Sequence, residues 1–245
     1  MISMLGNILS YIIFLWGWII LSSRLGSIIL PSPVEVAIVF KEEILTLNGL
    51  TQTMETLGRF LFSYFFSVVS GTLIGVVSFR YERIKKGLWP VVTSLQATPV
   101  ISWILLALLW FPSKLIPFFI LWVFIFPIIA INMYEGLAAT DKKLIEMARV
   151  YKLTKKDTFF KIYFPSALPY LRAGMKISAN SSLKVLVTAE IVGRLPKGMG
   201  SSMNNAWLNI DTASLLGWTI YLILLTNIVE GCITRAMTKT FRRYL

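Results

Sequence analysis

The chain has 245 residues, 56% of them hydrophobic, and its mean hydropathy is +0.71. A soluble domain must cover its surface with polar side chains, so this composition excludes one and indicates several membrane-spanning helices. The net charge of +12 does not indicate a nucleic-acid-binding protein, because the basic residues lie between apolar segments, where they act as signals of membrane topology.

Six apolar segments predict an all-α polytopic membrane protein with six transmembrane helices, forming one transmembrane domain of residues 1–245. The segments are residues 8–21, 53–79, 88–111, 115–134, 168–192 and 213–233. The first lacks a basic start and a cleavage site of small residues, so we expect a retained helix rather than a signal peptide. The connection 22–52 is long enough for a short amphipathic helix, at about residues 34–45.

Lysines and arginines orient the predicted helices. Fifteen of the 24 fall on one side of the membrane, within residues 80–86, 142–161 and 235–243. By the positive-inside rule this side is the cytoplasm. Both termini and the connection 135–169 are therefore expected to be cytoplasmic.

Polar residues in the second and third segments need partners at membrane depth. Glu55 and Arg59 lie one helical turn apart, and a stabilising pair between them is the favoured interpretation. Gly71 and Gly75 are expected to allow close packing of helices. Pro99 interrupts the backbone hydrogen bonding of the third segment. The polar residues around it are candidates for lining a translocation pathway: Gln96, Thr98 and Ser102.

The connection between the fourth and fifth segments, residues 135–169, is long, basic and internally patterned. Asp141 is placed to cap a helix whose apolar residues recur at helical spacing: Leu144, Ile145, Met147, Ala148 and Tyr151. Thr154 and Asp157 have the spacing of a capping box for a second short helix, which Pro165 is expected to end. The pattern predicts a helical hairpin on the membrane surface, with an apolar face to offer another protein.

The fifth segment carries the densest set of polar residues. Four of them recur at every fourth position and form one stripe along a helix: Lys176, Asn180, Lys184 and Thr188. Such a stripe suits a hydrated pathway, and its two lysines would favour an anion. Glu190, which ends the segment, joins the candidate pathway residues. The alternative is that Lys176 reaches the cytoplasmic interface and Lys184 pairs with a neighbouring helix.

The sequence contains no histidine, which excludes Ser–His and Cys–His nucleophile pairs and histidine-based zinc sites. Gly193 and Gly198 have the separation found in a phosphate-binding loop, but Met199 follows where that motif has lysine. We therefore expect this chain to hold no catalytic residue, no ATPase site, no metal and no cofactor of its own.

Several short motifs resemble those of the permease subunits of ABC importers, chiefly the nitrate, sulfonate and taurine branch. Glu146-Met147-Ala148, together with Phe164-Pro165, is similar to the EAA loop of that family. The other similar motifs are Thr188-Ala189-Glu190, Gly198-Met199-Gly200 and Leu30-Pro31-Ser32-Pro33. The resemblance covers about residues 30–235. One position departs from the pattern: Lys152 stands where the family usually has glycine, and we expect it to alter the turn between the two short helices.

The resemblance implies the membrane-spanning subunit of a bacterial ABC importer in the plasma membrane, without enzymatic activity. The loop 135–169 would be a coupling helix docked on an ATPase subunit, through Glu146, Met147, Ala148, Tyr151, Lys152 and Pro165. Gly198 and Gly200 would contact an extracytoplasmic substrate-binding protein. The other implied partners are a second permease copy in a homodimer and two ATPase subunits, which hold ATP and magnesium; nucleic acid is not among them.

The implied substrate is a small solute: an anion such as nitrate or a sulfonate, or a vitamin precursor. Three other classes of membrane protein are alternatives. The transmembrane coupling subunit of an energy-coupling-factor vitamin transporter would share Ala148-Arg149, but not the spacing from Glu146 to Pro165. An intramembrane enzyme would need nucleophiles or paired aspartates within a span, and a secondary transporter would need two inverted halves.

Overall fold

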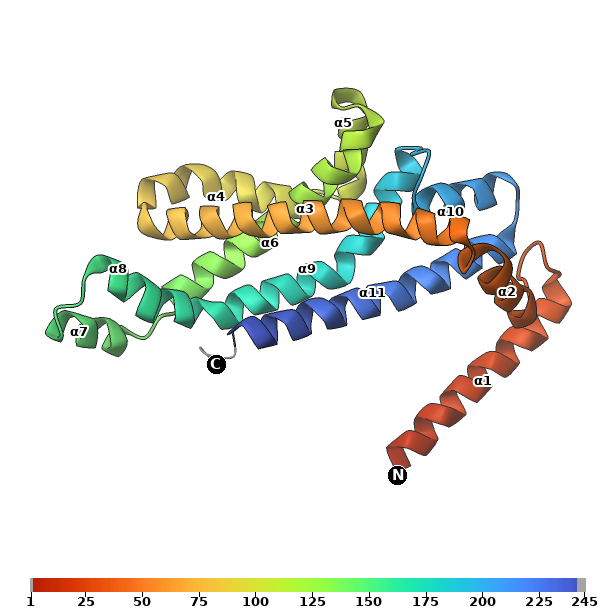
Figure 1. The fold of residues 1–245 in the computed structure, drawn as a ribbon, viewed down its shortest axis with the longest axis horizontal. Coiled ribbons are helices and arrows are strands. Elements are labelled where there is room, and N and C mark those ends of the chain that lie inside the picture. The colour runs from red at the N-terminus through yellow and green to blue at the C-terminus, as the bar shows by residue number, and fades with distance from the viewer. Residues whose placement is uncertain (1, 242–245) are drawn as a thin grey trace. The chain divides into compact units, whose positions relative to one another are not determined.

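The computed structural model describes residues 2–241, with the side chains of residue 10 and residues 12–239. Arg242 and Arg243, counted above among the cytoplasmic charges, lie outside this range. Throughout the described range the chain forms helices and no strand, which confirms the all-α class. Three helices are long and apolar enough to cross a membrane (Figure 1): α3 (Leu47–Arg80), α6 (Ile116–Ala138) and α11 (Thr212–Phe241). The protein is therefore a multi-pass membrane protein.

Two further helices correspond to predicted spans. α1 (Ile2–Leu25) is apolar, and the part of it with described side chains that counts as an apolar helix is Ile12–Leu25. α9 (Phe164–Val192) is 29 residues long, but its lysines, asparagine and serines make it less apolar than a typical span. The expectation of six spans stays a prediction.

One predicted span, residues 88–111, is bent in the structure rather than a single straight helix, and its crossing of the membrane stays a prediction. α4 (Glu82–Ala97) and α5 (Val100–Trp110) meet at an angle of 104°. Figure 1 shows the bend between the two helices. Thr98 between them is extended, with φ −79° and ψ 133°, because a proline disfavours the helical conformation of the residue before it. The pair is either a broken span or a re-entrant segment.

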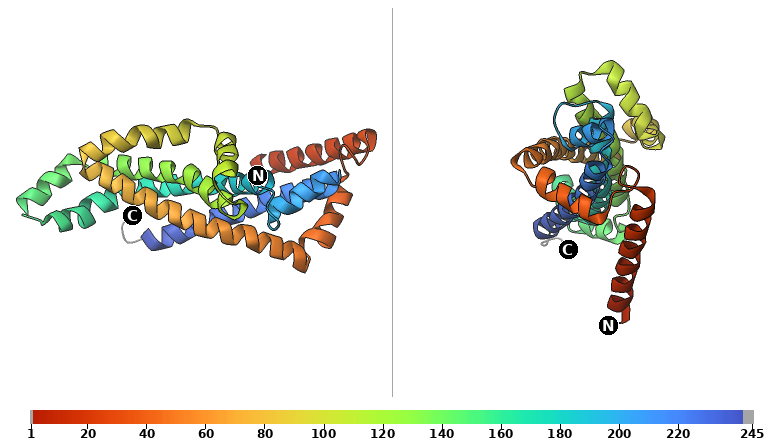
Figure 2. Two further views of the ribbon diagram at one scale, coloured as in Figure 1. Left: turned by 90° about the horizontal axis from the view of Figure 1, so that it is seen from above. Right: turned by 90° about the vertical axis from the view of Figure 1, so that its right-hand side faces the viewer.

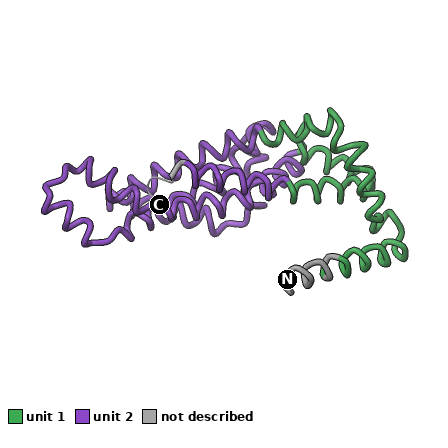
Figure 3. Tube along the Cα trace, turned by 60° about the horizontal axis from the view of Figure 1, so that its bottom comes forward, with its two compact units in different colours: residues 1–57, 194–224 green, residues 58–193, 225–245 purple. Residues whose placement is uncertain are grey.

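The described chain divides into two compact units, coloured separately in Figure 3. Unit 1, residues 1–57 and 194–224, contains α1, α2 (Pro33–Val39), the π-helical turn η1 (Phe40–Ile44), α10 (Met199–Leu208) and the N-terminal parts of α3 and α11. Ser32 and Glu35 cap α2 reciprocally: the Ser32 N–H donates to the Glu35 carboxylate at 2.7 Å, and the Glu35 N–H donates to Ser32 Oγ at 3.3 Å. A helix within residues 34–45 is thus confirmed.

Unit 2, residues 58–193 and 225–245, contains α4 to α9 and the remainder of α3 and α11. α6 and α9 pack against each other along their length, and α3 lies against α6 at Gly71 and Gly75. A Cβ atom added at Gly75 would stand 2.7 Å from Met133 Cβ and 2.8 Å from the Ala130 carbonyl oxygen. Only glycine leaves room for this approach, so the predicted close packing of helices is confirmed.

The connection after α6 forms a helical hairpin of α7 (Lys142–Val150) and α8 (Lys155–Thr158). In Figures 1 and 2 the hairpin projects beyond the adjacent ends of α3 and α4. Asp141 caps α7 by accepting the Lys143 N–H at 2.8 Å, and Thr154 Oγ1 caps α8 by accepting the Asp157 N–H at 3.1 Å. Both predicted helix starts are confirmed. The Asp157 carboxylate accepts from the Thr154 hydroxyl at 2.6 Å.

The prediction that Pro165 ends the second short helix is wrong. After α8 the chain continues through a π-helical turn, η3 (Phe159–Tyr163), directly into α9. Pro165 stands in the first turn of α9, where a missing N–H is tolerated, and the wider π turn before it rearranges the backbone hydrogen bonds. The second arm of the hairpin is therefore continuous with α9.

Candidate functional site

The tip of the hairpin exposes apolar side chains. Val150 and Tyr151 are 78% and 74% exposed, and Met147 and Leu144 on the same short helix are 44% and 39% exposed. Apolar side chains gathered in this way on a projecting helix mark a surface for another molecule. The hairpin therefore presents part of the predicted apolar face, namely Leu144, Met147 and Tyr151, whereas Ala148 is buried and Ile145 is half-buried.

The structure divides the predicted coupling residues into two groups. Ala148 is 3% exposed, and Pro165 is half-buried in the first turn of α9. The others are exposed on or beside α7: Glu146, Met147, Tyr151 and Lys152. Direct contact with a partner suits the exposed group, whereas Ala148 and Pro165 are placed to shape the hairpin.

Lys152 adopts the left-handed backbone conformation that favours glycine. Its φ is +51°, its N–H donates to the Arg149 carbonyl at 3.0 Å, and the Leu153 N–H donates to the Ala148 carbonyl at 2.9 Å. These two bonds form a Schellman motif, which ends α7. The expected change in the turn is not observed. The lysine instead keeps this geometry at a steric cost of about 1 kcal/mol.

Replacing Lys152 by glycine is expected to raise the free energy of unfolding by about 1 kcal/mol, since glycine takes a positive φ without that steric cost. Thermal unfolding of the purified chain in detergent measures the effect. Lys152→Ala is the matched control, because it removes the same charge but keeps Cβ, and it should give no gain. Equal stabilisation by both variants would assign the effect to charge and contradict the strain.

Asp157 is the acidic residue in the first turn of α8. Hydrogen bonds from Lys161, whose Nζ lies 2.8 Å away, and from Thr154 hold the pKa of this carboxyl below its usual range. A carboxylate that stays ionised at a helix N-terminus complements the positive end of the helix dipole. It helps to keep the second arm of the hairpin helical.

The polar stripe of α9 lies on one face of unit 2. Lys176, Lys184 and Thr188 are exposed and Asn180 is half-buried, as the spacing predicts. The Thr188 hydroxyl donates to the Lys184 carbonyl at 2.8 Å. Lys184 has no carboxylate within ion-pair distance in the part of the chain that the structure describes. The stripe therefore presents an uncompensated positive charge.

Glu230 of α11 is a residue of this site that the sequence analysis missed. Its carboxylate accepts a hydrogen bond from Asn180 Nδ2 at 2.5 Å and lies 3.9 Å from Lys176 Nζ. The lysine that pairs with a neighbouring helix is therefore Lys176, rather than Lys184 as the alternative interpretation had it. A lone carboxylate inside the apolar segment 213–233 was the signal for this residue, because such a group needs a partner at membrane depth.

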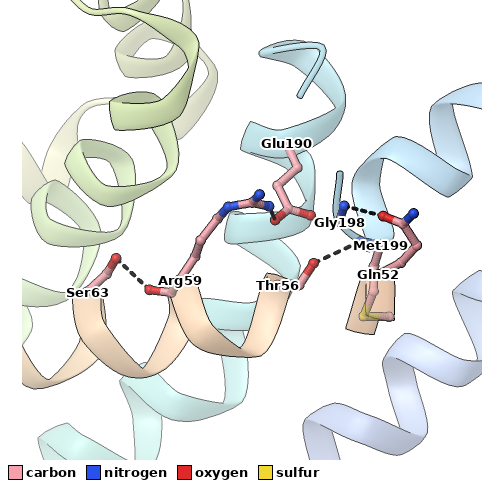
Figure 4. Close-up of polar contacts among 7 residues, drawn as sticks. All are labelled: Gln52, Thr56, Arg59, Ser63, Glu190, Gly198 and Met199. Carbon is pink, nitrogen blue, oxygen red and sulfur yellow. Dashed lines mark hydrogen bonds and ion pairs between the residues drawn. The ribbon is translucent and has the colours of Figure 1, made fainter. Parts of the chain in front are cut away.

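Glu190 lies off the stripe, in a buried ion pair. Its Oε1 is 2.6 Å from Arg59 Nη1, and its side chain has no exposed surface, whereas that of Arg59 is 23% exposed (Figure 4). Glu190 stands two positions after Thr188 in α9. This spacing corresponds to a rotation of about 200° around the helix, so Glu190 points away from the face of Thr188. Its assignment to a pathway gains no support from this position. The pairing of Arg59 with Glu55 stays a prediction.

A small pocket lies at the break between α4 and α5. Its volume is ≈ 150 Å³, and Gln96, Thr98 and Trp103 are among the residues that line it. The Trp103 indole nitrogen is buried and has no hydrogen-bond partner within the described residues. Ser102 is half-buried in the first turn of α5 and is not part of the lining. The structure thus brings Gln96 and Thr98 together, in a pocket that no residue of the α9 stripe lines.

Gly198 and Gly200 are buried in unit 1. Gly198 has a φ of +125°, which favours glycine, and its N–H donates to Gln52 Oε1 at 2.6 Å. The Met199 N–H donates to Thr56 Oγ1 at 2.8 Å (Figure 4). These bonds attach the start of α10 to the N-terminal part of α3. The pair shapes this corner of unit 1, and contact with a binding protein stays a prediction.

Comparison with known proteins gives consistent matches. Residues 67–239 match the family model described as "Binding-protein-dependent transport system inner membrane component". The nitrate import permease protein NrtB of Synechococcus elongatus is 31% identical over 192 residues, covering 74% of this chain and 68% of the relative. The putative aliphatic sulfonates transport permease protein SsuC of Bacillus subtilis is 28% identical over 184 residues, covering 74% and 66%.

A solved structure shares the fold. One chain of the MetNI methionine ABC transporter, in an inward-facing conformation, superposes with a TM-score of 0.60 at 21% identity. The match covers 80% of this chain and 99% of that chain. At this identity the likeness establishes the arrangement of helices and nothing about the transported solute.

Proposed function

The chain belongs to the family of binding-protein-dependent transport system inner membrane components and is a permease subunit of an ABC importer; on this premise we propose that two copies form the translocation pathway and couple it to separate ATPase subunits. Its relatives NrtB and SsuC support the nitrate and sulfonate branch. The observation that carries the coupling proposal is the exposed apolar face of α7, at the tip of a projecting hairpin.

Coupling would proceed through movement of this hairpin. ATP and magnesium bind the partner ATPase subunits, because this sequence has no phosphate-binding loop. Closure of two ATPase subunits would carry the two docked hairpins towards each other. Since the second arm of the hairpin runs without a break into α9, the movement would reach the membrane helices as a rigid-body shift and switch the pathway between its two openings.

The proposed topology has six passages in one transmembrane domain, residues 1–245. They are α1, α3, the bent pair α4 and α5, α6, α9 and α11. The hairpin and both termini lie in the cytoplasm of a bacterial cell, on the side that carries most of the lysines and arginines. The external segments would meet a substrate-binding protein that delivers the solute.

The polar stripe of α9 is the proposed lining of the pathway in the assembled dimer. Its exposure in a single chain supports this role, because lysine and threonine side chains facing lipid would be strongly unfavourable. Lys184 supplies a positive charge without a carboxylate beside it, so we propose an anionic substrate. The printed names of NrtB and SsuC, which refer to nitrate and aliphatic sulfonates, agree with this charge.

Replacing Lys184 by methionine is expected to raise the KM for uptake of an anion about tenfold, since a charged hydrogen bond to the solute is lost. Uptake of labelled nitrate and of an alkanesulfonate into proteoliposomes containing the complete transporter measures the effect. Lys184→Arg keeps the charge and should retain most of the activity. Unchanged uptake by the methionine variant would contradict an anion-selective stripe.

Affinity purification of the tagged chain from native membranes in mild detergent tests the function as a whole. We expect an ATPase with a phosphate-binding loop and an extracytoplasmic binding protein to copurify, and the ligand of that binding protein then identifies the substrate. An ATPase together with a small vitamin-binding membrane protein would instead indicate an energy-coupling-factor transporter. Absence of any ATPase would contradict the proposed coupling.

A further inference from the structure

A hollow of ≈ 780 Å³ lies in unit 2, behind the hairpin. One wall is the last turn of α3, and the others come from α7, α8 and η3. Its volume is within the range of about 300–1,000 Å³ that is usual for sites of small organic molecules. The coupling proposal assigns no occupant to it.

The charged residues around this hollow all have the same sign. Arg80, Arg149 and Lys155 are among its lining residues, and no acidic residue is. None of the three cations forms a salt bridge within the described part of the chain. Three basic side chains around one cavity favour an anionic occupant.

The remainder of the lining is largely apolar. Val76 and Phe79 stand just before Arg80 in α3, and Phe159 faces the same space from η3. Apolar residues therefore give way to cations at the point where a membrane-spanning helix ends. The order along α3 matches an amphiphile whose apolar chain lies against the end of the helix and whose charged group lies next to it on the hairpin side.

We propose that the hollow binds an anionic phospholipid, with its phosphate among Arg80, Arg149 and Lys155 and its acyl chain against Val76, Phe79 and Phe159. A protein partner has a separate surface, because the exposed apolar residues Val150 and Tyr151 do not line the hollow. The site would hold the hairpin against the end of α3 through a lipid. It is independent of which solute the transporter carries.

Native mass spectrometry of the purified full-length chain tests the site, with dioleoyl-phosphatidylglycerol or dioleoyl-phosphatidylcholine added in detergent. The native chain should bind phosphatidylglycerol more strongly than phosphatidylcholine. The triple variant Arg80→Gln, Arg149→Gln and Lys155→Gln should lose about fivefold in affinity for each cation removed, so about 100-fold in all. Its weak binding of phosphatidylcholine should not change.

The matched control is the triple variant Lys142→Gln, Lys143→Gln and Lys156→Gln, which removes the same charge from the same hairpin outside the lining. It should bind phosphatidylglycerol like the native chain. Val76→Trp, which fills the apolar part and keeps every charge, should also release the lipid. The proposal is overturned if the lining variants keep their lipid, if the control loses as much, or if the lining variants keep their lipid but lose the ATPase in affinity purification from native membranes.

Discussion

Replacing Arg59 by methionine is expected to lower the free energy of unfolding by about 3–5 kcal/mol, because it removes the arginine that forms an ion pair with the buried carboxylate of Glu190. The Nη1–Oε1 distance is 2.6 Å, and the Glu190 side chain has no exposed surface. Because Glu190 is fully buried, solvent compensates for the lost interaction less than it would at a surface pair. Thermal unfolding in detergent, followed by the intrinsic fluorescence of the tryptophans, measures the loss.

The double variant Arg59→Met and Glu190→Leu is the control for this prediction. It removes both charges of the pair, so neither is left without the other, and most of the stability should return. If transport stays low in the double variant although stability recovers, the pair also acts in the transport cycle. If the single variant unfolds like the native chain, the buried pair does not contribute to stability as the structure implies.

Hydrophobic patterning located the helices well but not their bends. The segment 88–111 is apolar on both sides of Pro99, so its hydropathy is that of a continuous span, although the structure bends it by 104°. At Pro165 the pattern predicts the end of a helix, whereas the structure continues the helix through a π turn. Hydropathy reports burial in lipid, whereas these two features depend on local backbone hydrogen bonding.

The polar sites were predicted where their geometry is local to one helix. Lys176, Asn180, Lys184 and Thr188 share a face because of the helical repeat alone. The partners contributed by other helices were missed. Arg59 and Glu190 are separated by 131 positions in the sequence, and Asn180 and Glu230 by 50, so only the tertiary fold brings each pair together.

The turn at Lys152 shows the limit of reasoning from a single residue type. Glycine is favoured at the end of a helix because it takes a positive φ easily, and a lysine there suggested another turn. The two Schellman hydrogen bonds, from Lys152 to Arg149 and from Leu153 to Ala148, fix the conformation instead. Their combined stabilisation offsets a strain of about 1 kcal/mol.

Replacing Tyr151 by aspartate is expected to weaken binding of the partner ATPase by more than about 100-fold and to abolish uptake. The tyrosine is 74% exposed beside Val150 on the tip of the hairpin, and a large aromatic side chain of this kind is a common energetic centre of an interface. Aspartate removes that contact and buries an unpaired carboxylate in its place. Binding of the purified ATPase to the detergent-solubilised chain, by surface plasmon resonance, measures the affinity.

Tyr81→Asp is the matched control for the docking surface, because Tyr81 is also exposed, at 56%, but lies between α3 and α4 outside the hairpin. It introduces the same charge and should leave ATPase binding unchanged. Equal weakening by both variants would indicate a general effect of charge at this end of the protein. Normal binding by the Tyr151 variant would show that α7 is not the docking element, and the hairpin would then need another role. Loss confined to Tyr151 would identify the short segment through which ATP-driven movement enters the membrane helices.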